Sequence, residues 1–203
     1  MSMRSFDPVR VGELECTAWV AYYQRRWPAF LRASFGLTRE SFGLSWPATL
    51  RGGWWVLRAN QAWAPYPDND PDRARVCMRR FYELVTEHSG EDFDPAEAAR
   101  LEVEWWRAHR ELQHDGEEAD DRELVQALAA LYSYVYSVPH EAVRVAAEQR
   151  AAAMAHSDRW VNQGRDPASP LIAEERAALV RSYEALREAV GRRVTQSRSP
   201  RPA

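Results

Sequence analysis

Helical periodicity extends through almost the whole sequence, and this feature limits the possible folds more than any other. Apolar residues recur every three or four positions, whereas the period-two alternation typical of half-buried strands is almost absent. Alanine, leucine, arginine and glutamate, which favour helices, dominate the composition. The pattern predicts an all-α fold, a bundle of about seven helices over residues 11–34, 47–63, 72–88, 95–113, 121–136, 140–162 and 171–192.

Several helix starts are marked by a capping residue that is followed directly by proline. Asp70, Asp94 and Ser169 each precede a proline, and Glu97 adds a carboxylate to the first turn of its helix. A side-chain oxygen at the N-cap accepts a backbone N–H that the helix leaves free, and proline fits at the first helical position. These signals predict where three of the helices begin.

Residues 34–46 are harder to assign, because they repeat the tetrapeptide Ser-Phe-Gly-Leu after seven residues without a clear helix start. We predict a connector whose phenylalanines, Phe35 and Phe42, fill part of the core. A mobile lid, or a contact between the copies of a homo-oligomer, is the alternative.

The length and composition of the chain suit one large domain. Its 203 residues are 45% hydrophobic and 28% charged, so a substantial core can be buried. We predict a single helical domain over residues 1–192 with an aromatic-rich core, because the chain has nine tryptophans. From Gly191 onward the sequence has four arginines, two prolines and no acidic residue, which predicts a disordered tail over residues 193–203.

Charge and cysteine content argue against several classes of protein. The net charge of −3 disfavours a protein whose main task is to bind nucleic acid. Cys16 and Cys77 lie in apolar helical contexts and are predicted to be free, buried thiols. There is no apolar signal segment at the N-terminus and no apolar run near the ~18 residues of a membrane span, so we expect a cytoplasmic protein. All 27 basic residues are arginine, which indicates a bacterial, G+C-rich genome.

The stretch 101–114, LEVEWWRAHRELQH, places two ionisable residues on an apolar helix face. At about 100° per residue, Glu102 and His109 project between the two tryptophans, whereas most other charges project to the opposite side. A carboxylate on a buried face needs an ion pair, a proton or a metal. His156 lies in the same way on the apolar face of the helix predicted over 140–162.

Two histidines and a carboxylate that point inward from different helices are the ligand type of a non-haem iron site. Glu102, His109 and His156 are therefore predicted to bind iron or manganese, with Glu15 as a further ligand or neighbour. Glu102, His109 and Tyr22 would then act in the oxidation of a small, partly apolar molecule. Without a metal, His109 would serve as a general base. A network of the same residues that only supports the fold is the alternative.

Aromatic residues also predict an apolar pocket, and those that would line it are Trp54, Trp55, Trp63, Tyr66, Tyr132, Tyr134 and Tyr136. Arg58, Asn60 and Trp106 are candidate substrate-pocket residues, because polar groups among aromatics can orient the polar part of a ligand. Ordinary core packing is the alternative for these aromatics. The pocket supports a second functional hypothesis, a non-catalytic helical protein that binds a hydrophobic ligand or a partner helix.

Common catalytic motifs are missing. The sequence has no Gly-x-Ser-x-Gly, no phosphate-binding glycine loop and no His-Glu-x-x-His. The acidic run 68–72 resembles half of a calcium loop, but Arg73 and Arg79 stand where glycine and glutamate are needed, so helix capping explains it better. Glu111 and His114 match the Glu-x-x-His pattern of di-iron proteins only once, and on the solvent side of their helix.

Overall fold

The computed structural model describes residues 3–115 and 120–196, and these residues form helices without any strand. The all-α prediction is confirmed, with one helix more than expected. The eight helices are α1 (Pro8–Tyr23), α2 (Trp27–Phe42), α3 (Trp46–Trp63), α4 (Pro71–Ser89), α5 (Pro95–Asp115), α6 (Arg122–Tyr136), α7 (His140–Asn162) and α8 (Leu171–Gln196).

The additional helix arises because the predicted helix 11–34 is wrong and is divided into α1 and α2. Arg25, between them, adopts a left-handed backbone with φ 56°. Pro28, in the first turn of α2, lacks the N–H that a continuous helix would need there and would clash with the preceding turn. Proline is tolerated in a first turn, so the chain ends one helix and starts another.

The prediction of a connector at 34–46 is also wrong, because α2 continues to Phe42. Gly43, with φ 63°, ends α2, and only a short link leads to α3. The phenylalanines do pack inward. The ring of Phe42 meets that of Phe81 edge-on at 5.2 Å between centroids, and the ring of Phe35 lies directly on the backbone of Gly53 in α3.

The remaining predicted helices are confirmed to within a few residues, and the expected caps are formed. Asp70 accepts a hydrogen bond from the backbone N–H of Arg73 at 2.9 Å, and Asp94 accepts one from that of Ala96 at 2.9 Å. Helix α8 continues to Gln196, so the first four residues of the predicted tail are helical. The rest of that tail lies outside the described residues.

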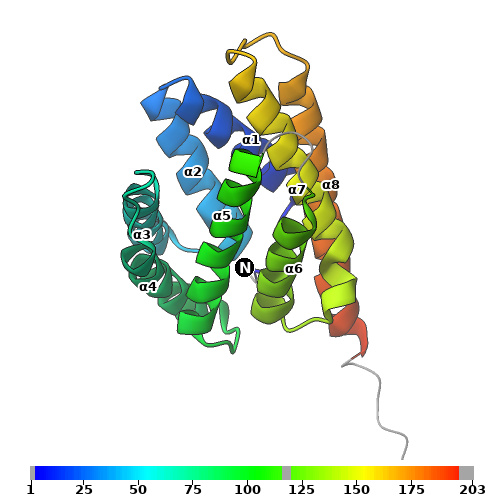
Figure 1. Cartoon of the computed structure of the whole chain (residues 1–203). Helices are drawn as coiled ribbons and strands as arrows, with labels where there is room; N and C mark the ends of the chain where they lie inside the picture. The colour runs from blue at the N-terminus through cyan, green and yellow to red at the C-terminus, as the bar shows by residue number, and fades with distance from the viewer. Residues whose placement is uncertain (1–2, 116–119, 197–203) are drawn as a thin grey trace, which may run out of the picture.

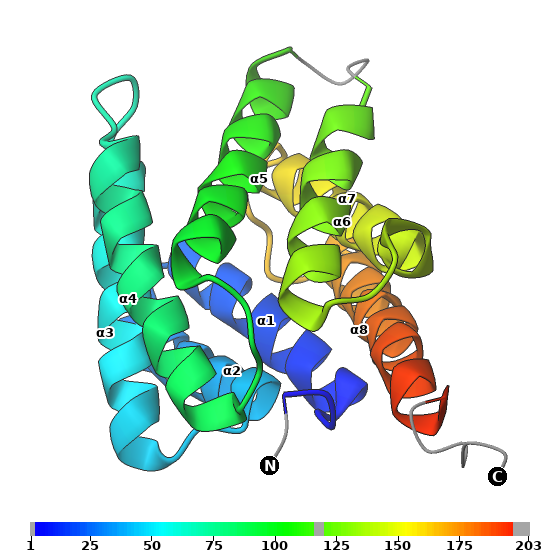
Figure 2. The same cartoon turned by 90° about the horizontal axis from the view of Figure 1, so that it is seen from below.

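The helices are arranged in pairs. Figures 1 and 2 show α3 and α4 on one side, α7 and α8 on the other, and α5 and α6 between them. Helix α1 packs against both α2 and α8. The main core contains many aromatic side chains, including Phe81, Tyr82, Trp105, Trp106 and Tyr132.

A smaller core between α1, α7 and α8 contains Cys16, Trp160 and Leu179. Cys16 and Cys77 are free and buried, as predicted. In the described part of the chain, no helix combines the length and the apolar character needed to cross a membrane.

Candidate functional site

Glu102, the predicted carboxylate ligand, is held by hydrogen bonds from two aromatic residues. Its carboxylate accepts a hydrogen bond from the hydroxyl of Tyr82 at 2.8 Å and one from Nε1 of Trp106 at 3.2 Å. Burial raises the pKa of Glu102, while the hydrogen bond from Tyr82 opposes this rise. Glu102 therefore joins α4 to α5 within the protein.

The two histidines predicted as ligands each pair with a different carboxylate. Nε2 of His109 lies 2.9 Å from Oδ2 of Asp158 on α7, while Nδ1 of His156 lies 3.0 Å from Oε2 of Glu174 on α8. Burial, and next the charge of Arg159, lowers the pKa of His156. Asp158 and His156 are two residues apart on α7, about 200° around the helix, so His156 projects from the side of α7 opposite to the one that His109 contacts.

The three predicted ligands are therefore not brought together. Within residues 3–115 and 120–196, no group of three or more histidine, cysteine, aspartate or glutamate side chains is placed to hold a metal ion.

Glu15 belongs to a buried ion pair. The guanidinium of Arg150 on α7 donates to both of its oxygens, at 3.1 and 2.5 Å, and the hydroxyl of Tyr183 on α8 donates to it as well. The guanidinium also lies over the Trp105 ring, 5.6 Å from its centroid. Burial lowers the pKa of Arg150, but Glu15, Tyr132 and Tyr183 together outweigh this effect, and the pKa of Arg150 is raised. Tyr22, in contrast, is 38% exposed at the surface of α1.

Close to this ion pair lies a second buried acid that the sequence pattern did not single out. Glu175 on α8 is only 1% exposed, and its Oε2 has no hydrogen-bond partner among the described residues. Burial, and next the charge of Glu15, raises the pKa of Glu175 to about 8. Burial likewise raises the pKa of the nearby Cys16 thiol to about 12, which excludes a thiolate nucleophile at neutral pH.

The predicted pocket residues Arg58 and Asn60 lie on the outer part of α3. Arg58 donates to Gln61 at 3.0 Å, and Asn60 donates to the carbonyl of Val56 at 2.9 Å. Trp106 is buried, and its ring packs against that of Trp63 at 5.9 Å between centroids. None of these three residues lines the nearby cavity, but Trp63, against which Trp106 packs, does.

That cavity lies between the end of α3, the loop that follows it, the start of α4 and the second half of α5. Its volume is about 470 Å³. Aromatic and charged side chains dominate its lining, which consists of Trp63, Tyr66, Asn69, Pro71, Arg75, Val103, Glu104, Arg107, Arg110, Glu111 and His114. Trp63 and Tyr66 are the predicted pocket aromatics that line it.

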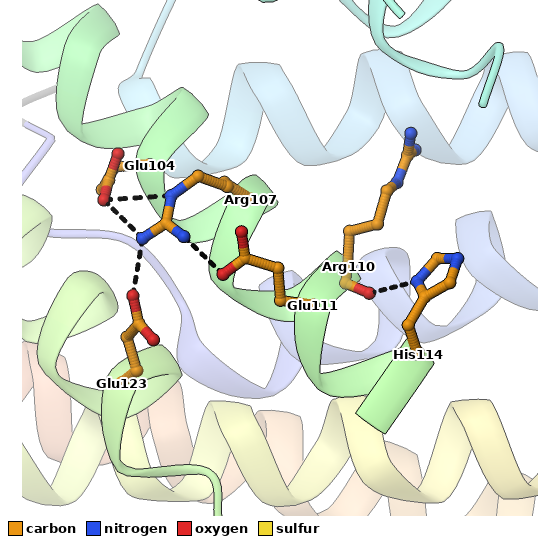
Figure 3. Close-up of polar contacts among 6 residues, drawn as sticks. All are labelled: Glu104, Arg107, Arg110, Glu111, His114 and Glu123. Atoms are coloured by element: carbon orange, nitrogen blue, oxygen red, sulfur yellow. Dashed lines mark hydrogen bonds and ion pairs between the residues drawn. The ribbon is translucent and has the colours of Figure 1, made fainter. Parts of the chain in front are cut away.

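The two arginines of α5 in this cavity differ in their partners. Arg107 donates to Glu104 at 2.8 Å, to Glu123 at 2.5 Å and to Glu111, and Figure 3 shows its guanidinium surrounded by these carboxylates. These hydrogen bonds, above all the one that Arg107 donates to Glu104, raise the pKa of Arg107. Its charge is therefore compensated within the protein.

Arg110 has no carboxylate partner among the residues that the structure describes. Its guanidinium donates to the carbonyl of Trp63 at 2.9 Å and lies over the rings of Trp63 and Tyr66, at 4.7 and 5.6 Å from their centroids. In Figure 3 it points away from the carboxylates around Arg107. Burial lowers the pKa of Arg110, as expected for a half-buried cation without a counter-charge.

His114 completes the aromatic side of the cavity. Its ring lies 4.5 Å from that of Tyr66 between centroids, and its Nδ1 is 2.6 Å from the carbonyl oxygen of Arg110. A carbonyl only accepts hydrogen bonds, so Nδ1 carries the hydrogen and Nε2 of the neutral ring remains an acceptor. The cavity thus combines several aromatic rings, a guanidinium without a carboxylate partner among the described residues, and an imidazole.

The helical spacing of α5 is the signal by which these residues could have been found in the sequence. Trp106, Arg110 and His114 are four residues apart and form one stripe at the edge of the apolar face. The helical phase alone predicts solvated side chains for Arg110 and His114, because both lie at the edge of the apolar face and not at its centre.

A second hollow, of about 630 Å³, lies between the start of α5 and the end of α6, but its polar groups already serve the fold. Asp94 caps α5, and its backbone N–H donates to the hydroxyl of Tyr134 at 3.1 Å. The cavity at Arg110 is therefore the better candidate for a ligand.

No protein-family model, curated protein or solved structure matches the chain. The class of protein is thus defined by these features alone, a helical bundle with a pocket that is aromatic and cationic.

Proposed function

We propose that this protein is a non-catalytic helical protein that binds a small, flat, anionic molecule in the cavity at Arg110. The observation that carries the proposal is the half-buried guanidinium of Arg110, which lies against two aromatic rings and has no carboxylate partner among the described residues. A buried charge without a partner is unfavourable, and an anionic ligand would supply the partner.

The chemistry of the cavity favours a carboxylate or phosphate attached to an aromatic ring. A guanidinium presents paired N–H donors that match the two oxygens of such a group. The rings of Trp63, Tyr66 and His114 offer flat surfaces to a ring system. A cavity of about 470 Å³ has the size of typical small-molecule sites.

Calorimetric titration with indole-3-carboxylate and with its uncharged amide tests this proposal. We expect the carboxylate to bind at least about tenfold more tightly than the amide, because only the anion compensates Arg110. Arg110→Gln should weaken binding of the carboxylate by about 10- to 100-fold and leave the amide almost unaffected. The matched control is Arg100→Gln, an exposed arginine on the same helix.

Equal affinities for the carboxylate and the amide, or equal effects of Arg110→Gln and Arg100→Gln, would contradict the proposal. Displacement of the carboxylate by inorganic phosphate would show that the anionic group dominates recognition.

The enzyme hypothesis, with iron or manganese bound by Glu102, His109 and His156, stays a prediction with less support. Each of these side chains already has a protein partner of its own. Metal analysis of protein purified without chelator, before and after reconstitution with iron or manganese, tests it. The predicted homo-oligomer and the cytoplasmic, bacterial origin likewise stay predictions.

A further inference from the structure

Helices α2 and α3 begin with the same short sequence. Residues 27–32 read Trp-Pro-Ala-Phe-Leu-Arg, and residues 46–51, 19 positions later, read Trp-Pro-Ala-Thr-Leu-Arg. The correspondence continues to a second arginine, twelve residues after each tryptophan, at Arg39 and Arg58. In both copies the tryptophan is the first residue of its helix.

The large apolar residues that the two copies share are exposed. Trp27 and Leu31 are 52% and 42% exposed in α2, and Trp46 and Leu50 are 57% and 54% exposed in α3. Trp54, one turn further along α3, is 55% exposed. Packing in the core therefore cannot explain why these residues recur, and so large an indole surface in water is unfavourable unless another surface covers it.

The segment that contains these exposed apolar residues is positively charged. Residues 24–63 contain six arginines and one acidic residue, a net charge of +5, whereas the rest of the chain carries −8. Among the described residues, none of these six arginines forms an ion pair with a carboxylate, although many arginines of α4 to α7 do. Figure 1 shows α2 and α3 on the side of the bundle away from α7 and α8.

The arginines flank the apolar stripe on both helices. At about 100° per residue, each leucine lies about 40° from its tryptophan, and the two arginines lie about 140° and 120° from it. The guanidinium carbon of Arg39 is 4.9 Å from the centroid of the Trp46 ring, and that of Arg58 is 5.9 Å from the centroid of the Trp54 ring. Cations and indoles are thus side by side on this surface.

We propose that this surface, which we call the α2–α3 face, binds to the anionic surface of a phospholipid membrane. Tryptophan prefers the boundary between headgroups and acyl chains, and arginine extends to the phosphates while its stem stays in the apolar layer. Helices with leucine and tryptophan on one side and basic residues beside them bind in this plane. The proposal does not depend on the ligand proposed for the Arg110 cavity.

Charge and composition favour a membrane over the other partners considered. Two copies of the chain that met through this face would bring twelve arginines together with only two carboxylates, those of Glu40 in each copy. Single-stranded nucleic acid can stack its bases on the tryptophans, but it has no acyl layer to cover Leu31 and Leu50. An anionic lipid surface satisfies both the arginines and the leucines.

Flotation of the full chain with lipid vesicles tests the proposal. We expect binding to vesicles that contain phosphatidylglycerol, little binding to pure phosphatidylcholine, and a blue shift of the tryptophan emission on binding. The charge reversal Arg32→Glu with Arg51→Glu should reduce the partition coefficient by about 30-fold or more. The matched control pair is Arg73→Glu with Arg187→Glu, two exposed arginines on α4 and α8.

A second pair of variants tests the apolar contribution. Leu31→Ser with Leu50→Ser should weaken binding to anionic vesicles by at least about tenfold, whereas Val76→Ser with Val145→Ser, at exposed positions on α4 and α7, should leave it unchanged. Circular dichroism and thermal unfolding of each variant show whether the fold is retained.

Equal binding to neutral and anionic vesicles, or equal losses in the test and control pairs, would overturn the membrane assignment. It would also be overturned if the protein bound no vesicles and the Arg32→Glu, Arg51→Glu variant lost binding to a single-stranded RNA oligomer. The same holds if the protein bound no vesicles and this variant dissociated a dimer in analytical ultracentrifugation.

Discussion

Arg150 and Arg110 show two ways in which this protein treats a buried cation. Arg150 is enclosed by α1, α7 and α8 and donates to both oxygens of Glu15, so the protein itself compensates its charge. Arg110 lies between aromatic rings and a backbone carbonyl and has no such carboxylate in the described part of the chain. The difference suggests that the first arginine supports the fold and that the second is available to a ligand.

The largest loss of stability is expected when the buried ion pair between Arg150 and Glu15 is broken. Arg150→Met should lower the free energy of unfolding by ~3–5 kcal/mol, because it leaves the carboxylate of Glu15 buried without its partner. Urea unfolding followed by circular dichroism measures this loss. In the double variant Arg150→Met with Glu15→Gln, most of the loss should be recovered, since no uncompensated charge remains. If the double variant were no more stable than the single one, the pair would not act through charge.

A smaller effect is expected at Glu175, where the pKa is raised to about 8 from an ordinary value of 4.5. The folded state holds the proton more tightly than the unfolded state, so the stability that the protonated carboxyl contributes is full below about pH 4.5 and is lost as the pH rises towards 8. Glu175→Gln should therefore remove a decrease on the order of 3 kcal/mol between pH 5 and pH 8.

The measurement for Glu175 is the free energy of unfolding of each protein at several pH values across this range. A pH-independent cost of the glutamine side chain cancels when the values of one variant at two pH values are compared. Glu184→Gln, at an exposed position on the same helix, is the control and should leave the pH dependence as it is. If stability decreased from pH 5 to pH 8 as steeply in Glu175→Gln as in the wild type, the role of Glu175 would be contradicted.

The smallest effect on stability is expected at Arg110, and this sharpens the contrast with Arg150. Arg110→Gln should change the free energy of unfolding by less than ~1 kcal/mol, because no carboxylate loses a partner. The same variant should strongly reduce binding of the anionic probe. A large loss of stability in Arg110→Gln would show that Arg110, like Arg150, supports the fold, and it would contradict a role for Arg110 in ligand binding.

Most of the helices could be predicted because their signals are local. A capping aspartate and the proline after it act within one turn, and the structure contains the hydrogen bonds that they predict at Asp70 and Asp94. The error over residues 11–34 came from the same kind of signal, since Pro28 was not taken as a helix start. The phase of a helix also located Glu102 on the inner side of α5, where its carboxylate meets Tyr82.

Partners between helices could not be predicted, because the helical phase tells which side a residue faces but not which helix lies there. His109 and His156 both point towards other helices, yet those helices are α7 and α8 respectively. The repeat at 27–32 and 46–51 is visible in the sequence, but only the exposure of its tryptophans and leucines gives it a meaning beyond packing.

The contact of Phe35 with Gly53 has a consequence for the repeat. The ring lies so close to the α3 backbone that a Cβ atom at position 53 would overlap it, so glycine allows α2 to approach α3 closely at this point. Two weakly binding helices that are held together act as a bivalent binder, because binding of the first helix raises the effective concentration of the second helix at the same surface. In the proposed binding of the α2–α3 face to a membrane, Gly53 would thus contribute to avidity by holding the two helices together.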